Sequence, residues 1–109
     1  MKDGLHIDKD GNKQWWFNDR RHREDGPAVE WTDGQQRWFL DGLRHREDGP
    51  AIERANGDKS WYLHGMRHRE DGPAVKLANG TKAWYLNNTQ YTEDEFILKT
   101  SKFWQQVSK

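Results

Sequence analysis

Polar and apolar positions alternate along this chain in a pattern that returns at a fixed interval. The polar block Arg-His-Arg-Glu-Asp-Gly-Pro-Ala occurs at 21–28, 44–51 and 67–74, so successive blocks lie 23 residues apart. After each block come a β-branched residue, an Asp-Gly or Asn-Gly pair, two adjacent aromatic residues and a leucine. Self-similarity at a fixed period of this length indicates a repeat architecture, in which one small structural unit is copied along the chain.

Each unit is predicted to be one β-hairpin. Asp-Gly and Asn-Gly supply the positive φ angles of a two-residue hairpin turn, which predicts strand 27–32, turn 33–34 and strand 35–40 in the first full unit. A glycine before proline is biased to an extended conformation, and proline has no N–H group. We therefore interpret the polar block as an ordered reversal leading to the next strand. Such hairpins form an antiparallel meander that advances about 10 Å per repeat.

The chain is expected to form one domain in three parts. Residues 1–20 hold a degenerate leading hairpin, residues 21–89 hold three full repeats of 23 residues, and residues 90–109 hold a C-terminal capping helix. The predicted fold class is therefore mainly β, a repeat meander of about four antiparallel hairpins closed at one end by a single α-helix.

The helix prediction rests on a change of pattern after residue 91. Thr92 and Glu95 have the spacing of a capping box, and acidic residues fill the first turn. The prediction is a helix over about 93–107 whose apolar stripe contains Phe96, Thr100, Phe103, Trp104 and Val107. Two roles are open for it, covering the last repeat or binding a partner.

The composition predicts a core built from aromatic residues. Seven tryptophans among 109 residues offset a shortage of aliphatic residues, because each aromatic side chain buries a large area. Trp38, Trp61 and Trp84 share one strand face with the leucine two positions later, and the following Phe or Tyr lies on the opposite face. We expect the Trp and Leu face to be the core under the helix. The second aromatic face is either packed under Arg and Pro side chains or partly exposed.

The charge pattern excludes several classes of protein. Eighteen basic and 18 acidic residues cancel, there is no cysteine, and no apolar run is long enough for a membrane span or a signal peptide. We therefore expect a soluble cytoplasmic protein without disulfides. We do not expect nucleic-acid binding, because each Arg-His-Arg is followed at once by Glu-Asp. By unit, the charge runs from −2 over 21–43 through 0 over 44–66 to +2 over 67–89, which suits a partner of complementary polarity or head-to-tail self-association.

The histidines of the repeated block could be taken for catalytic bases. His22, His45 and His68 each stand beside two carboxyl residues, but an active site needs one constellation rather than three equal copies. Equivalent histidines about 10 Å apart cannot share a metal ion either. We therefore predict no enzyme activity, no metal and no cofactor, and assign a structural role to the repeated residues His22, Asp25, Gly26, Pro27, His45, Asp48, Gly49, Pro50, His68, Asp71, Gly72, Pro73, Trp38, Trp61 and Trp84.

The repeats over residues 5–89 resemble MORN repeats, and most closely their variant form. His64-Gly65-Met66-Arg67-His68 is similar to the Asn-Gly-Lys-Arg-His stretch of that repeat, but Arg69–Pro73 replaces the usual Gly-x-Gly. The string His-Arg-Glu-Asp-Gly-Pro-Ala also resembles tandem repeats in uncharacterised proteins of bacteriophages and giant viruses. The resemblance implies β-hairpin units. For function it implies interaction, scaffolding or membrane-associated modules, with an antitoxin-like bacterial branch.

A partner surface is expected where equivalent positions differ between units. A scaffold position has the same neighbours in every repeat, whereas an irregular partner demands different side chains. This argument selects Trp31, Gln35, Arg37, Leu43, Arg54, Lys59, Met66, Leu77 and Lys82. The predicted function is a non-catalytic protein-binding module, in its most specific form a phage-encoded inhibitor or adaptor acting on a host protein. The alternatives are a toxin-neutralising antitoxin, a small-ligand binder and a nucleic-acid-binding platform.

Overall fold

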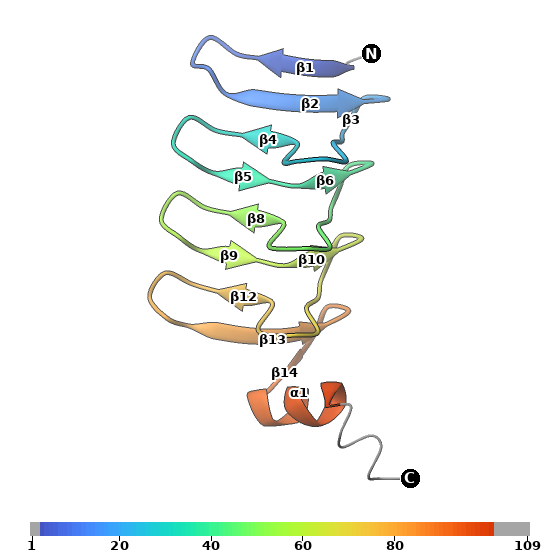
Figure 1. Cartoon of the computed structure of the whole chain (residues 1–109), viewed down its shortest axis with the longest axis vertical. Coiled ribbons are helices and arrows are strands. Elements are labelled where there is room, and N and C mark those ends of the chain that lie inside the picture. Colours follow the sequence, from blue (N-terminus) through green and yellow to red (C-terminus); the bar gives the residue numbers. More distant parts are fainter. Residues whose placement is uncertain (1–2, 102–109) are drawn as a thin grey trace.

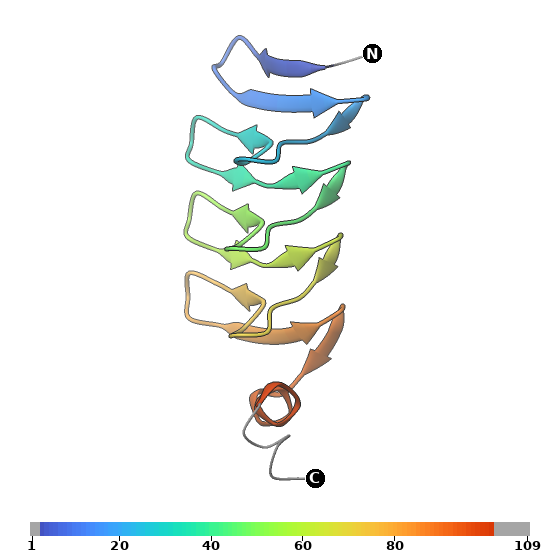
Figure 2. The same ribbon diagram turned by 45° about the vertical axis from the view of Figure 1, so that its right-hand side comes forward.

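The computed structural model describes residues 3–101, which form a thin antiparallel meander that ends in one helix (Figure 1). Along the main sheet the strands follow one another in the order of the sequence, as predicted for a meander, and two further two-stranded ladders lie off this path. The leading hairpin consists of β1 (Gly4–Ile7) and β2 (Lys13–Phe17). The array closes with β13 (Lys82–Leu86), β14 (Thr89–Tyr91) and α1 (Glu93–Thr100). The molecule measures 56 × 31 × 19 Å, so it is a slab one sheet thick, with repeats stacked along its length (Figure 2).

Between the two ends, the three repeats contribute very short strands in a constant order. They are β3 (Arg20–Arg21), β4 (Val29–Glu30), β5 (Gln36–Arg37), β6 (Phe39–Leu40), β7 (Leu43–Arg44), β8 (Ile52–Glu53), β9 (Lys59–Ser60), β10 (Tyr62–Leu63), β11 (Met66–Arg67) and β12 (Val75–Lys76).

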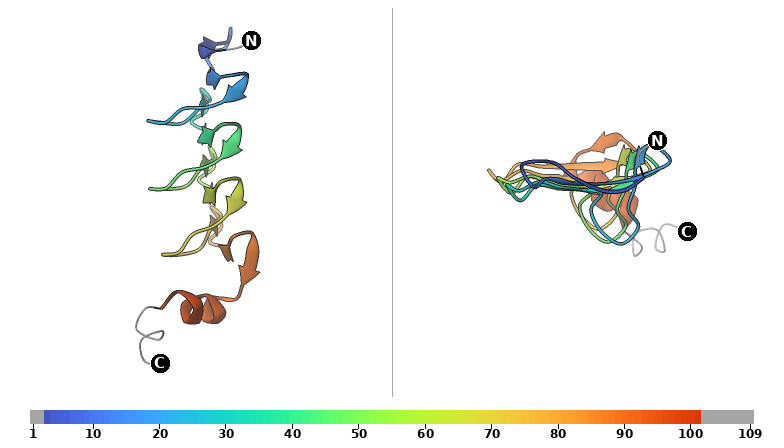
Figure 3. Two further views of the ribbon diagram at one scale, coloured as in Figure 1. Left: turned by 90° about the vertical axis from the view of Figure 1, so that its right-hand side faces the viewer. Right: turned by 90° about the horizontal axis from the view of Figure 1, so that it is seen from above.

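Every second strand of the array is interrupted by the polar block. Strands β5 and β6 follow each other almost directly along the chain. Strand β5 pairs with β8 and strand β6 pairs with β7, so β7 and β8 are the two halves of an interrupted strand. Trp38 marks the junction, because its N–H donates to the Ala51 carbonyl and its carbonyl accepts from the His45 N–H. The residues between β7 and β8 leave the sheet and form a reversal loop. The three reversal loops, 22–27, 45–50 and 68–73, project from one side of the strand layer (Figure 3).

The structure has two kinds of turn, and the one at Asp33-Gly34 is longer than predicted. The predicted two-residue turn at Asp33-Gly34 is wrong: Trp31 N–H donates to the Gln35 carbonyl at 2.9 Å, and Gly34 N–H donates to the Trp31 carbonyl at 3.0 Å. Gly34 has a φ of 98°, which makes a three-residue loop with a glycine bulge. The bulge shifts the register, so that Glu30 lies opposite Gln36.

The two-residue turns lie instead at the other end of each hairpin. Asp41 and Gly42 have φ values of 50° and 81°, and the strand residues on either side, Leu40 and Leu43, pair directly. His64-Gly65 repeats this geometry. Positive φ at both central positions is the mark of a type I′ turn, whose twist matches that of the strands it joins.

The buried side of the sheet differs from the prediction. Cross-strand pairing places Val29, Arg37 and Ile52 in one row on the same face. We call this side the arginine face and the opposite side, over which the reversal loops lie, the loop face. The buried large side chains are on the arginine face, where Phe39 and Tyr62 are 9% and 7% exposed. Trp38, Trp61 and Trp84 lie on the loop face and are only half-buried, because polar loops cover them instead of a second apolar layer.

The helix begins as predicted and covers the last strands of the array. Thr92 accepts from the Glu95 N–H, and Glu95 accepts from the Thr92 N–H, which completes the capping box. Helix α1 packs against β13 and β14 and buries Phe96. The described helix ends at Thr100, and the predicted stripe residues Phe103, Trp104 and Val107 lie outside the described residues. None of the helices in residues 3–101 is long and apolar enough to cross a membrane.

Candidate interaction surface

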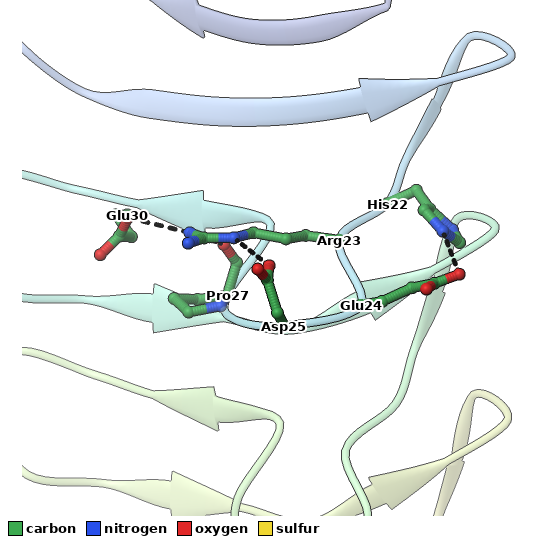
Figure 4. A network of polar contacts seen from close by, with 6 residues as sticks. All are labelled: His22, Arg23, Glu24, Asp25, Pro27 and Glu30. Carbon is green, nitrogen blue, oxygen red and sulfur yellow. Dashed lines mark hydrogen bonds and ion pairs between the residues drawn. The ribbon is translucent and has the colours of Figure 1, made fainter.

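The second arginine of each polar block holds its reversal loop together. The Arg46 guanidinium lies 4.0 Å from the Trp38 ring centre, and it donates to Asp48 at 2.9 Å and to the Pro50 carbonyl at 3.2 Å. Arg23 repeats these contacts one unit earlier. It also reaches Glu30 at 3.4 Å (Figure 4). A planar fork that stacks on a ring and donates to two acceptors is specific to arginine. These side chains are therefore engaged within the fold.

The histidine of each block ties its reversal loop to the two-residue turn near the end of the same 23-residue unit. His45 Nδ1 accepts from the backbone N–H of His64, the first residue of the following type I′ turn, at 2.9 Å. His22 and His68 make the same bond to Asp41 and Asn87. Nδ1 must be unprotonated to accept, so its lone pair is already occupied. The arrangement is that of a structural connector.

The glycine before each proline is required by crowding rather than by its backbone angle. A Cβ atom added to Gly49 would lie 2.8 Å from Cζ of Arg46, and Gly26 and Gly72 face Arg23 and Arg69 in the same way. None of these three glycines has a positive φ. A side chain at this position would displace the guanidinium that organises the loop.

Shallow grooves separate the reversal loops on the loop face. One, of about 410 Å³, is lined by Trp38, Leu40 and the loops that begin at His22 and His45. The next, of about 460 Å³, is lined by Trp61, Leu63 and the following pair of loops. In each groove an arginine already lies against the tryptophan ring, at 4.0 Å for Arg46 and 3.9 Å for Arg69. Within residues 3–101 there is no group of three or more His, Asp or Glu side chains placed to hold a metal ion.

The nine variable residues do not form one surface. Strand alternation puts five of them on the arginine face, namely Trp31, Gln35, Arg37, Arg54 and Leu77. Lys59 and Lys82 lie on the loop face, because they pair with Glu53 and Lys76. Leu43 and Met66 lie beside the type I′ turns, at the end of the hairpins opposite the three-residue loops. The structure therefore brings together just over half of the predicted site.

The sequence argument missed three residues that extend this group. Arg21, Arg44 and Arg67, the first arginines of the blocks, pair with Trp16, Phe39 and Tyr62 and so lie on the arginine face. Because the residue two positions later leaves the strand and turns over the loop face, the two arginines of each block end on opposite sides. Strand alternation counted from the type I′ turn would have identified them.

Arg37 is the centre of a cluster of like charges. Burial is the largest cause that lowers the pKa of Arg37, followed by the charges of Arg54, Arg44 and Arg21. Its terminal nitrogen donates to Gln35 Oε1 at 3.3 Å, whereas its Nε is shielded from solvent and has no hydrogen-bond partner among the described residues. Even so, a guanidinium stays charged at neutral pH. The cluster therefore concentrates positive charge on an open sheet face.

Comparison with known proteins assigns no family to the chain. A scan against protein-family models gave no match, and a search of the curated proteins gave none either. The similarity to MORN repeats therefore stays a prediction, and any statement about function rests on the surfaces described above.

Proposed function

We propose that this chain is a non-catalytic protein-binding repeat module. The observation that carries the proposal is a division between repeated and variable side chains. The repeated Arg46, His45 and Asp48 make contacts inside the fold, whereas the variable Trp31 and Leu77 are each 37% exposed on the arginine face. Tryptophan and arginine are the residues most enriched at the centres of protein interfaces.

The shape of the surface favours a macromolecular partner. The slab presents broad faces and shallow grooves, whereas small molecules are usually held in concave sites that enclose most of the ligand. In the more specific form of the proposal, the chain is a phage-encoded inhibitor or adaptor that acts on a host protein in the cytoplasm. That form draws on the resemblance of the repeated block to viral tandem repeats.

Affinity capture tests the proposal directly. The immobilised chain should retain one protein partner from a lysate of the cell in which it acts, at near-physiological salt, and Trp31→Ala should reduce the retention at least tenfold. Phe17→Ala is the matched control, because Phe17 is a 51% exposed aromatic residue on the opposite face. Retention of a metabolite without any protein would contradict the proposal. A single tight partner with the activity of a toxin would favour the antitoxin alternative.

A further inference from the structure

A column of arginines runs along the open face of the array. Arg21, Arg44 and Arg67 occupy equivalent positions in successive repeats, and all three are exposed. Each lies beside the second aromatic residue of its own 23-residue unit, 5.7 Å from Phe39 in the first case. The corresponding distances to Tyr62 and Tyr85 are both 5.3 Å. Cation–π contact of this kind holds the guanidinium over the ring. Arg21 also donates from Nε to Gln14 Oε1 at 3.2 Å, and a hydrogen bond with Tyr62 is the largest cause that raises the pKa of Arg67. An arginine has five N–H donors, so each guanidinium keeps donors for a ligand.

The two faces of the sheet differ in charge although the chain is neutral. Among the strand residues described on the arginine face, none is acidic, and four are arginine: Arg21, Arg37, Arg44 and Arg67. The strand carboxylates Glu30 and Glu53 lie on the loop face beside Arg23 and Arg46. The expectation of a neutral surface, based on Glu-Asp following Arg-His-Arg in the sequence, does not hold for this face.

Two carboxylates beside the three-residue loops already accept hydrogen bonds within the chain. Asp58 accepts from the Ala78 N–H at 2.7 Å and from Asn56 at 3.2 Å. Asp33 accepts from both the backbone and the side chain of Gln35. An incoming anion would therefore supply charge that the fold itself does not.

The chemistry of the column favours carboxylates on a protein over a nucleic acid. Single-stranded nucleic acids bind by stacking bases on open aromatic rings, but Phe39 and Tyr62 are buried beneath Arg21 and Arg44. The cations of the strands on this face are arginines, whose planar fork matches a carboxylate. The exposed apolar side chains of Trp31 and Leu77 on the same face suit a folded protein segment.

The repeat spacing selects the form of that segment. Two strands per unit advance the array by about 10 Å, so the three equivalent arginines are separated by about that distance. An α-helix rises about 1.5 Å per residue, and seven residues therefore span about 10.5 Å. A helix with an acidic residue at every seventh position would offer one carboxylate to each repeat.

We propose that the arginine face binds an acidic α-helix of the partner protein, laid along the array with carboxylates at seven-residue spacing. Arg21, Arg44 and Arg67 each take one carboxylate, Arg37 and Arg54 add charge beside the first two, and Trp31 and Leu77 contact apolar side chains of the same helix. This inference rests on the proposed protein-binding function and adds the chemistry of the partner.

A designed helical peptide tests the inference without the natural partner. The probe is an alanine-rich helix of about 25 residues with three Glu residues seven positions apart, and its control has the same composition with the three Glu residues five positions apart. Arginine Nε–Hε resonances report on each side chain in ¹⁵N-labelled protein. Those of Arg21, Arg37, Arg44 and Arg67 should shift saturably at low salt, with a Kd of about 1 mM or tighter. Those of Arg23, Arg46 and Arg69 should not move.

Charge variants supply the matched control. The triple variant Arg21→Gln/Arg44→Gln/Arg67→Gln should bind the probe about tenfold more weakly, because each exposed pair contributes modestly. Lys59→Gln/Lys76→Gln/Lys82→Gln removes the same charge from the loop face and should bind the probe as tightly as the unaltered chain does.

Equal shifts at all arginines, equal binding of the control peptide, or tighter binding of an oligo(dT) strand would overturn the inference. If the arginine triple variant still captures the cellular partner, the inference fails and the binding-module proposal survives; if no partner is captured at all, that proposal fails first.

Discussion

The guanidinium carbon of Arg46 lies 4.0 Å from the ring centre of Trp38, the residue between β5 and β6. The contact recurs between Arg23 and Trp15 and between Arg69 and Trp61. The arginine side chain thus joins a reversal loop to the sheet, and its N–H groups donate to the Asp carboxylate and the Pro carbonyl of that loop. A slab with so little buried apolar area depends on such polar anchors as well as on apolar burial.

Arg46→Lys should destabilise the protein although the charge is kept. Lysine cannot stack as a plane or donate to Asp48 and the Pro50 carbonyl together. We expect the free energy of unfolding, measured by urea titration, to fall by about 1–3 kcal/mol. Arg44→Lys, two residues away but exposed on the arginine face, should cost less than about 0.5 kcal/mol. Equal losses in the two variants would show that the loop contacts carry no special stability.

Gly49→Ala should be destabilising for a steric reason that a double mutant can identify. The new Cβ would meet Arg46 Cζ at 2.8 Å, and overpacking of this kind costs about 1–3 kcal/mol. In Arg46→Ala/Gly49→Ala the clash is absent, so the double variant should lose clearly less than the sum of the single losses in urea titrations. Additive losses would contradict the steric explanation.

The sequence predicted the architecture well because its signals repeat. The 23-residue period, the meander and the start of the helix at the Thr92 capping box all follow from local patterns that occur in several copies or have a strict spacing. The turn types were harder to predict, because Asp-Gly suits both a two-residue turn and a three-residue loop with a glycine bulge. Only the length of strand on either side decides between them.

The faces of the sheet could not be assigned from the sequence alone. Strand alternation separates Trp38 from Phe39, but which of the two is buried depends on where residues 45–50 go after leaving the strand. Because the chain leaves the strand after Arg44, Arg44 lies on the arginine face and Arg46 on the loop face. Net charge per segment therefore hid a segregation of charge that only the three-dimensional path of the chain reveals.

Stability should fall in acid through identified carboxyl groups. The hydrogen bond from Arg46, followed by its charge, lowers the pKa of Asp48, and the bond from the Thr92 N–H lowers the pKa of Glu95. A group whose pKa is lower in the folded state stabilises fully above its unfolded value near about 4, and this contribution is lost as the pH falls through the folded pKa. The urea midpoint should therefore be lower at pH 3 than at pH 6.

The pair Asp48→Asn/Glu95→Gln tests the assignment. This double variant should be less stable than the unaltered chain at pH 6 and should show a smaller decrease between pH 6 and pH 3, because two of the responsible groups no longer titrate. An unchanged decrease would place the acid sensitivity in other carboxyl groups.

His45→Ala should separate the connector role of the histidine from partner binding. The substitution leaves the His64 N–H without its acceptor at 2.9 Å and removes a ring that is 7% exposed and packs on His64 at 4.5 Å. The expected cost is about 1–3 kcal/mol of unfolding free energy. His6→Ala changes an exposed residue of β1 and should cost less than about 0.5 kcal/mol.

Partner binding by His45→Ala is measured at a temperature at which the variant is still folded. The variant should then retain the same partner with the same affinity, because the side chain lies on the loop face. Loss of partner binding in a protein that is still folded would place the binding surface on the loop face, and would contradict the assignment of binding to Trp31 and the arginine face.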